Sequence, residues 1–118
     1  MPLSCLIVDD NASFLQAARR LLERQGLTVA GVASNGAQAL EMTERLRPDV
    51  VVVDVVLGEE SGFDVARRLA PVDRRRPAVI LVSTHAESDF ADLIEETPAA
   101  GFLPKSELSA QAILRLVA

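Results

Sequence analysis

Five short apolar runs, separated by longer amphipathic stretches, constrain the fold of this chain more than any other feature. The runs are LSCLIV (Leu3–Val8), LTVAGV (Leu27–Val32), VVVVD (Val50–Asp54), AVILV (Ala78–Val82) and AGFL (Ala100–Leu103). Runs of this length between turn signals indicate β-strands. Strands that are apolar at successive positions are buried on both faces, as in a parallel sheet covered by helices.

The stretches between these runs have the spacing of amphipathic helices. In Asn11–Gln25 one stripe carries Phe14, Leu15, Ala18, Leu21 and Leu22, and Gly26 follows as a stop signal. Further helices are expected after a cap at Ser34 or Asn35 and ending before Pro48, over Ser61–Ala70, over Glu87–Glu96, and from about Glu107–Ser109 onward. Five strands alternating with five helices predict a doubly wound α/β fold with a five-stranded parallel sheet, as one domain over residues 1–118.

Polar residues gather where the predicted strands end. Asp9 and Asp10 follow the first strand, Asp54 ends the third, Ser83 and Thr84 follow the fourth, and Lys105 comes after the fifth, across Pro104. In open α/β sheets the functional crevice lies at the carboxyl ends of the strands, where the strand order reverses. We therefore expect these side chains to meet at one edge of the sheet.

Each of these residues alone has an ordinary explanation. An Asp after a strand is usually a turn former or helix cap, a Ser or Thr there is usually a capping hydroxyl, and a lysine is usually a surface charge. Those explanations do not predict the whole set at these positions. Clustered carboxylates repel one another without a cation, and Mg²⁺ prefers oxygen ligands. A lysine ammonium and a hydroxyl complete a site for a phosphoryl group.

The segments LIVDD, VVVVD, LVST and GFLPK, in this order and at these spacings, resemble the signature segments of the receiver domains of two-component response regulators, including the chemotaxis regulators. The resemblance covers essentially the whole chain. It implies a flavodoxin-like sheet of strand order 2-1-3-4-5. It also implies a phosphoprotein switch that takes a phosphoryl group from a sensor histidine kinase or phosphotransfer protein, with Mg²⁺ or alternatively Mn²⁺ as cofactor.

Carried over by position, the resemblance makes Asp54 the phosphoacceptor. Asp10 would be a direct metal ligand, Asp9 would reach the metal mainly through water, and the backbone carbonyl of Val56 would be a third protein ligand. Ser83 and Lys105 would bind the phosphoryl group, and Ser83 with Phe102 would form the conformational switch. Phe102 is equally well explained as a core residue, and the two roles are compatible.

The chain departs from the usual receiver pattern at several positions. Gly58 stands where a proline is common, Thr84 where Ala or Gly is common, and Phe102 where tyrosine is commoner, whereas Gly62 retains the later glycine of the pattern. Val56, Thr84 and His85 are expected to flank the approach of water to the phosphoryl group, and so to gate hydrolysis. His85 also has the ordinary interpretation of an exposed loop residue.

Two other functions are weighed against the signalling switch. A receiver that works as a constitutive interaction module is disfavoured by the complete acidic, hydroxyl and lysine set. A Mg²⁺-dependent phosphohydrolase of similar topology needs a second Asp two residues after its nucleophile, where this chain has Val56. The domain is thus expected to catalyse only its own phosphorylation and dephosphorylation, and otherwise not to be an enzyme.

Composition limits the partners and the compartment. The net charge is −5, which disfavours direct binding to nucleic acid or to an anionic membrane. The single cysteine, Cys5, lies in an apolar run and is interpreted as a buried core residue, and the start of the chain lacks a signal-peptide pattern. We expect a cytoplasmic protein that acts on an output domain or a downstream protein, with phosphorylation-dependent homodimerisation as a further option. The run Arg74–Arg76 is interpreted as a solvated loop.

Overall fold

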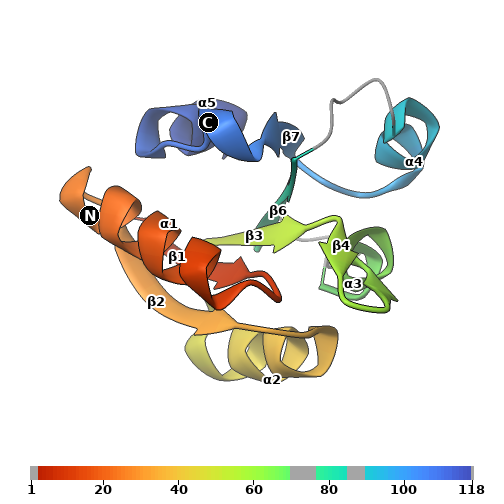
Figure 1. The fold of residues 1–118 in the computed structure, drawn as a ribbon, viewed down its shortest axis with the longest axis horizontal. Helices are drawn as coiled ribbons and strands as arrows, with labels where there is room; N and C mark the ends of the chain where they lie inside the picture. The colour runs from red at the N-terminus through yellow and green to blue at the C-terminus, as the bar shows by residue number, and fades with distance from the viewer. Residues whose placement is uncertain (1–2, 70–76, 85–89, 118) are drawn as a thin grey trace.

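The sheet expected from the apolar runs is present. The computed structural model describes residues 3–69, 77–84 and 90–117. Its main sheet has five parallel strands in the order β2-β1-β3-β6-β7 (Figure 1). The strands are β1 (Ser4–Val8), β2 (Thr28–Ala33), β3 (Val50–Asp54), β6 (Ala78–Ser83) and β7 (Gly101–Pro104). Because β6 and β7 are the fourth and fifth strands of this sheet, the order is the predicted 2-1-3-4-5.

Alternate residues of the strands enter two separate cores. Leu6, Val51 and Val53 pack on one face, whereas Ile7 and Val52 pack on the other. The second face is covered by α1 (Ala12–Arg24) and α5 (Ala110–Val117). The first is covered by α2 (Gly36–Leu46) and α3 (Gly62–Leu69), with Ile94 of α4 (Ala91–Glu96) at its margin. This three-layer arrangement explains why the strands carry no polar alternation.

Asparagine side chains cap the first two helices. The side chain of Asn11 accepts a hydrogen bond from the amide of Phe14 at 3.1 Å, and the side chain of Asn35 accepts one from the amide of Gln38 at 2.8 Å. Asn35 is therefore the cap of α2, and Ser34 is not. α2 ends at Leu46, and Arg47 has the left-handed φ of 50° directly before Pro48.

Two local features were not predicted. A short antiparallel pair, β4 (Val56–Leu57) with β5 (Glu60–Ser61), follows β3 and occupies the start of the expected third helix, which begins instead at Gly62. A 3-10 turn over Lys105–Glu107 precedes α5. Two-residue strands and single turns are too short to have a periodic signature.

Several expectations fall on residues outside the described ranges. These are the Arg74–Arg76 run, Ala70 at the end of the third helix, His85, and the first residues of the expected fourth helix. Cys5 is fully buried, as expected for a core residue. Over residues 3–69, 77–84 and 90–117, no helix has the length and apolar character needed to cross a membrane.

Candidate phosphoryl-transfer site

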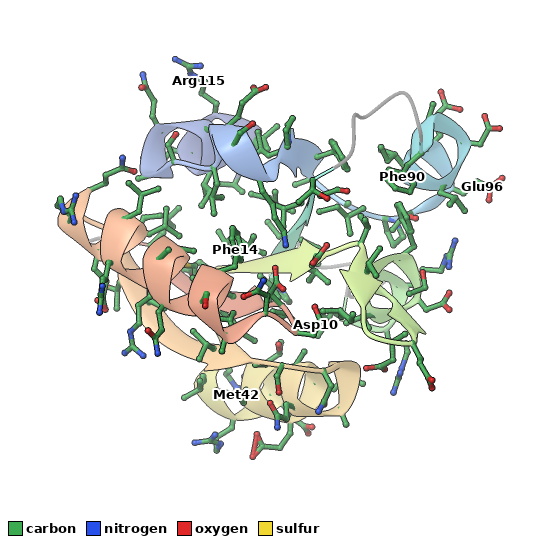
Figure 2. The ribbon with its side chains drawn as sticks, in the orientation of Figure 1. Asp10, Phe14, Met42, Phe90, Glu96 and Arg115 are labelled. Carbon is green, nitrogen blue, oxygen red and sulfur yellow. The ribbon has the colours of Figure 1, made fainter. Side chains whose placement is uncertain are left out.

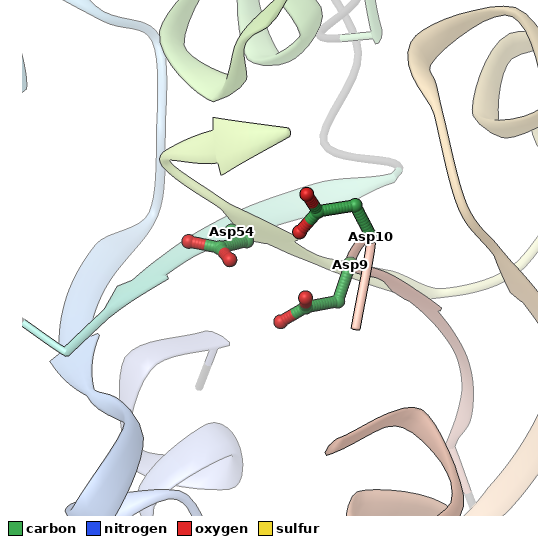
Figure 3. Close-up of side chains that lie close together, drawn as sticks. All are labelled: Asp9, Asp10 and Asp54. Carbon is green, nitrogen blue, oxygen red and sulfur yellow. The ribbon is translucent and has the colours of Figure 1, made fainter. Parts of the chain in front are cut away.

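Three carboxylates converge at the carboxyl edge of the sheet. β1 and β3 are adjacent and parallel, with Val8 paired to Val53, so the next residues of the two strands come side by side. One carboxylate oxygen from each of Asp9, Asp10 and Asp54 accordingly lies within 4.8 Å of the other two (Figure 3). The predicted acidic cluster is thus a consequence of strand register.

The three carboxylates differ in exposure and in backbone support. Asp9 is fully buried, Asp54 is 7% exposed and Asp10 lies at the surface. The amide of Asn11 donates to Asp9 Oδ1 at 2.8 Å, and the amide of Val56 donates to Asp54 Oδ1 at 3.1 Å. The amide of Gly58 donates to Asp10 Oδ2 at 2.9 Å. Each carboxylate therefore has one oxygen held by the backbone, which fixes its orientation.

Lys105 supplies the positive charge of the site. Its Nζ lies 2.7 Å from Asp9 Oδ2 and donates a hydrogen bond to Asp54 Oδ2 at 3.0 Å. Burial by itself lowers the pKa of this ammonium, but its contacts with the two carboxylates outweigh burial and raise the pKa above its ordinary value. Burial raises the pKa of Asp9, against the opposing effect of Lys105. Lys105 is therefore fully charged at neutral pH.

The donor set fits a hard divalent cation. Asp9 Oδ2 is buried and, among the described residues, receives no well-directed hydrogen bond, although the charge of Lys105 lies close to it. Because Lys105 already lies against this oxygen, the fit to a cation rests on the three clustered carboxylates together, which repel one another unless positive charge is added. Three carboxylates that each offer one oxygen to the same point match the preference of Mg²⁺ for oxygen ligands.

Ser83 is the last residue of β6 and Thr84 follows it, at the end of the fourth strand of the sheet as predicted. Asp54 pairs with Val82 across the sheet, and Ser83, the next residue of β6, pairs with Pro104, which directly precedes Lys105. Ser83 is 1% exposed, whereas Thr84 is exposed. The Ser83 backbone is therefore held between the end of β3 and the residue that carries the ammonium.

Phe102 belongs to the core. It is 8% exposed and packs against Phe90, with 6.4 Å between the ring centroids, and Phe90 in turn packs against Phe63 of α3 at 5.7 Å. Figure 2 shows Phe90 where α4 begins. The core interpretation of Phe102 is confirmed, and its switch role stays a prediction.

Two residues near the site were missed by sequence reasoning. Gly58 was seen only as a departure from a pattern, yet its amide holds Asp10, a bond that proline could not make because it has no N–H. Gly58 also has a φ of 60°, which suits glycine. Phe14 was assigned to the core stripe of α1 and does pack against that core, but it is only half-buried and its ring also lies against Lys105. Helical spacing cannot reveal a contact with a residue so distant in sequence.

Comparisons with known proteins identify the family of the chain. The family pattern of the response regulator receiver domain matches residues 5–117. The chain is 34% identical over 109 residues to a protein-glutamate methylesterase/protein-glutamine glutaminase of Alkalilimnicola ehrlichii, covering 89% of this chain and 27% of that protein. The chain spans between 24% and 55% of the length of the first four curated relatives that it matches.

Solved structures show the same fold. A two-component response regulator of the LuxR family from Aurantimonas sp. is 27% identical with a TM-score of 0.87, covering 99% of this chain and 86% of that one. A response regulator from Burkholderia pseudomallei, solved with a phosphorylated aspartic acid, a calcium ion and citrate, is 25% identical with a TM-score of 0.82, covering 98% and 66%. The chain belongs to the family of response regulator receiver domains, the signal-receiving modules of two-component systems.

Proposed function

We propose that Asp54 accepts a phosphoryl group from a histidine kinase or phosphotransfer protein, and that this modification switches the domain's interactions with an output domain or a downstream protein. The observation that carries the proposal is the joint placement of Asp9, Asp10, Asp54 and Lys105. Three carboxylates, each with one oxygen within 4.8 Å of the others, and one half-buried ammonium support a site for a divalent cation and a phosphoryl group.

Asp54 is suited to act as the nucleophile. Its Oδ1 accepts from the amide of Val56 and its Oδ2 from Lys105, so both oxygens of the carboxylate are held in place. In the transfer, an Asp54 oxygen forms a bond to phosphorus while the N–P bond of the donor phosphohistidine breaks. The freed imidazole nitrogen keeps the electron pair and takes a proton from solvent. Lys105 and the Ser83 hydroxyl would then each contact one phosphoryl oxygen.

Asp9, Asp10, Asp54 and the backbone carbonyl of Val56 would hold the cation, with Mn²⁺ as an alternative to Mg²⁺. When bound, the metal neutralises charge on the phosphoryl oxygens during in-line transfer. The Gly58 amide keeps Asp10 at the rim of the site. In the protein without metal, Lys105 balances Asp9 and Asp54 instead.

Val56, Thr84 and His85 would control hydrolysis of the aspartyl phosphate. Val56, two residues after Asp54, is 52% exposed, and Thr84 is also exposed. The branched apolar side chain of Val56 cannot orient an attacking water. Ser83 and Phe102 would carry the change outward, because Phe102 packs through Phe90 toward α4. By itself the domain would catalyse only its own phosphorylation and dephosphorylation, in the cytoplasm, with homodimerisation after phosphorylation as one output.

The direct test is phosphorylation by a small donor. With acetyl phosphate and Mg²⁺, intact-mass measurement should show one added phosphoryl group on the parent. Asp54→Asn should show none, while Asp49→Asn, a change in a carboxylate at the opposite end of β3 that is bonded to Ser4, should label like the parent. Stoichiometric labelling of Asp54→Asn would overturn the assignment.

A further inference from the structure

The ammonium of Lys105 has an aromatic ring on one side. Its Nζ lies 4.4 Å from the centroid of the Phe14 ring, with Asp9 and Asp54 as its ionic partners. The Lys105 side chain is 16% exposed and Phe14 is half-buried. Figure 2 shows Phe14 projecting from α1 toward the C-terminal elements. A cation over a ring face at this distance is attracted by the electron density of the ring.

The ring is placed by the same segment that builds the acidic cluster. The amide of Asn11 donates to Asp9, and the side chain of Asn11 accepts from the amide of Phe14. The turn that orients Asp9 therefore also caps α1 and fixes where the Phe14 ring lies relative to Lys105.

We propose that Phe14 is a positioning residue, which holds the Lys105 ammonium beside Asp54, ready for the incoming phosphoryl oxygen. The inference rests on the proposed function. A divalent cation at the carboxylates would repel the ammonium and weaken its pairing with Asp9. The attraction of a neutral ring does not depend on the charge of the carboxylates. Lysine is a flexible point charge, so a fixed ring limits the positions that the ammonium can take when the metal is bound.

The composition of the chain permits an unambiguous test, because Lys105 is the only lysine among 118 residues. In a sample labelled with isotopic lysine, the ε-methylene resonance reports on this side chain alone. The parent should show an upfield ring-current shift, both without metal and in the complex with Mg²⁺ and beryllofluoride, which imitates the phosphoryl group. Phe14→Leu keeps an apolar side chain of similar bulk without a ring, whereas Phe14→Tyr keeps the ring.

We expect Phe14→Leu to lose the shift and to bind beryllofluoride roughly fivefold more weakly, the size expected for one partly desolvated cation–ring contact. Phe14→Tyr should keep both properties, and this rescue separates a role of the ring from a role in packing. Unchanged affinity in Phe14→Leu, or equal losses in both variants, would overturn the role of Phe14. Failure of the parent itself to bind beryllofluoride with Mg²⁺ would instead overturn the proposed function.

Discussion

Gly62 allows the backbone at Asp54 to close against α3, and replacing it with alanine should damage the site. A methyl group at Gly62 would overlap the carbonyl oxygen of Asp54 and approach the Cα of Val55 to 2.6 Å. The amide of Gly62 also donates to the carbonyl of Val55 at 2.8 Å. The atoms in the way are backbone atoms, so no side chain can move aside to make room.

The cost of Gly62→Ala follows from these contacts. Overpacking against rigid backbone costs about 1–3 kcal/mol, and a weakened backbone hydrogen bond adds about 1 kcal/mol. We therefore expect a loss of about 2–4 kcal/mol in the free energy of unfolding, measured by urea denaturation. Because the end of β3 must shift, Mg²⁺ binding measured by titration calorimetry should weaken as well.

Gly26→Ala is the matched control. Gly26 has a φ of 98°, and a methyl group added there would meet no atom within 4 Å, so alanine suffers backbone strain without crowding. That strain should cost about 1–2 kcal/mol and leave Mg²⁺ binding unchanged. Gly62→Ala could instead lose no more unfolding free energy than Gly26→Ala and bind Mg²⁺ like the parent. The close approach to Asp54 would then not be the reason why this position needs glycine.

Three further predictions concern the metal, the water path and the buried thiol. Asp10→Ala should markedly weaken Mg²⁺ binding in calorimetry, and parent-like affinity would mean that the metal site is misplaced. Val56→Asn should shorten the lifetime of the aspartyl phosphate roughly tenfold, about 1.4 kcal/mol in barrier height, and an unchanged decay rate would remove Val56 from the gating role. Burial raises the pKa of Cys5 from 9.0 to about 11. The stability that the buried neutral thiol contributes is therefore complete below pH 9 and falls by up to about 2.7 kcal/mol as the pH rises toward 11. Urea denaturation of Cys5→Ala should therefore show a smaller loss over this pH window, and parallel losses would contradict the shifted pKa.

The architecture was open to prediction because it depends on patterns that are local in the sequence. The run Val50–Val53 enters both cores, and the resulting absence of polar alternation marks a strand covered on two faces. Once the strands are parallel, the residues that follow them share one edge, so Asp9, Asp54 and Lys105 were expected together. These three residues come together because of the strand order and register, which the whole sheet sets.

The tertiary structure alone decided which groups support those residues. The Gly58 amide reaches Asp10 over 48 positions of the chain, and the Phe14 ring meets Lys105 across two layers of the fold. Neither contact has a periodic signature. The first depends on how the loop after β3 turns, and the second depends on how α1 packs beside the end of β7. The sequence by itself determined the fold and the chemical groups of the site. Their orientation came from backbone amides and one ring, which only the packed chain brings within contact distance.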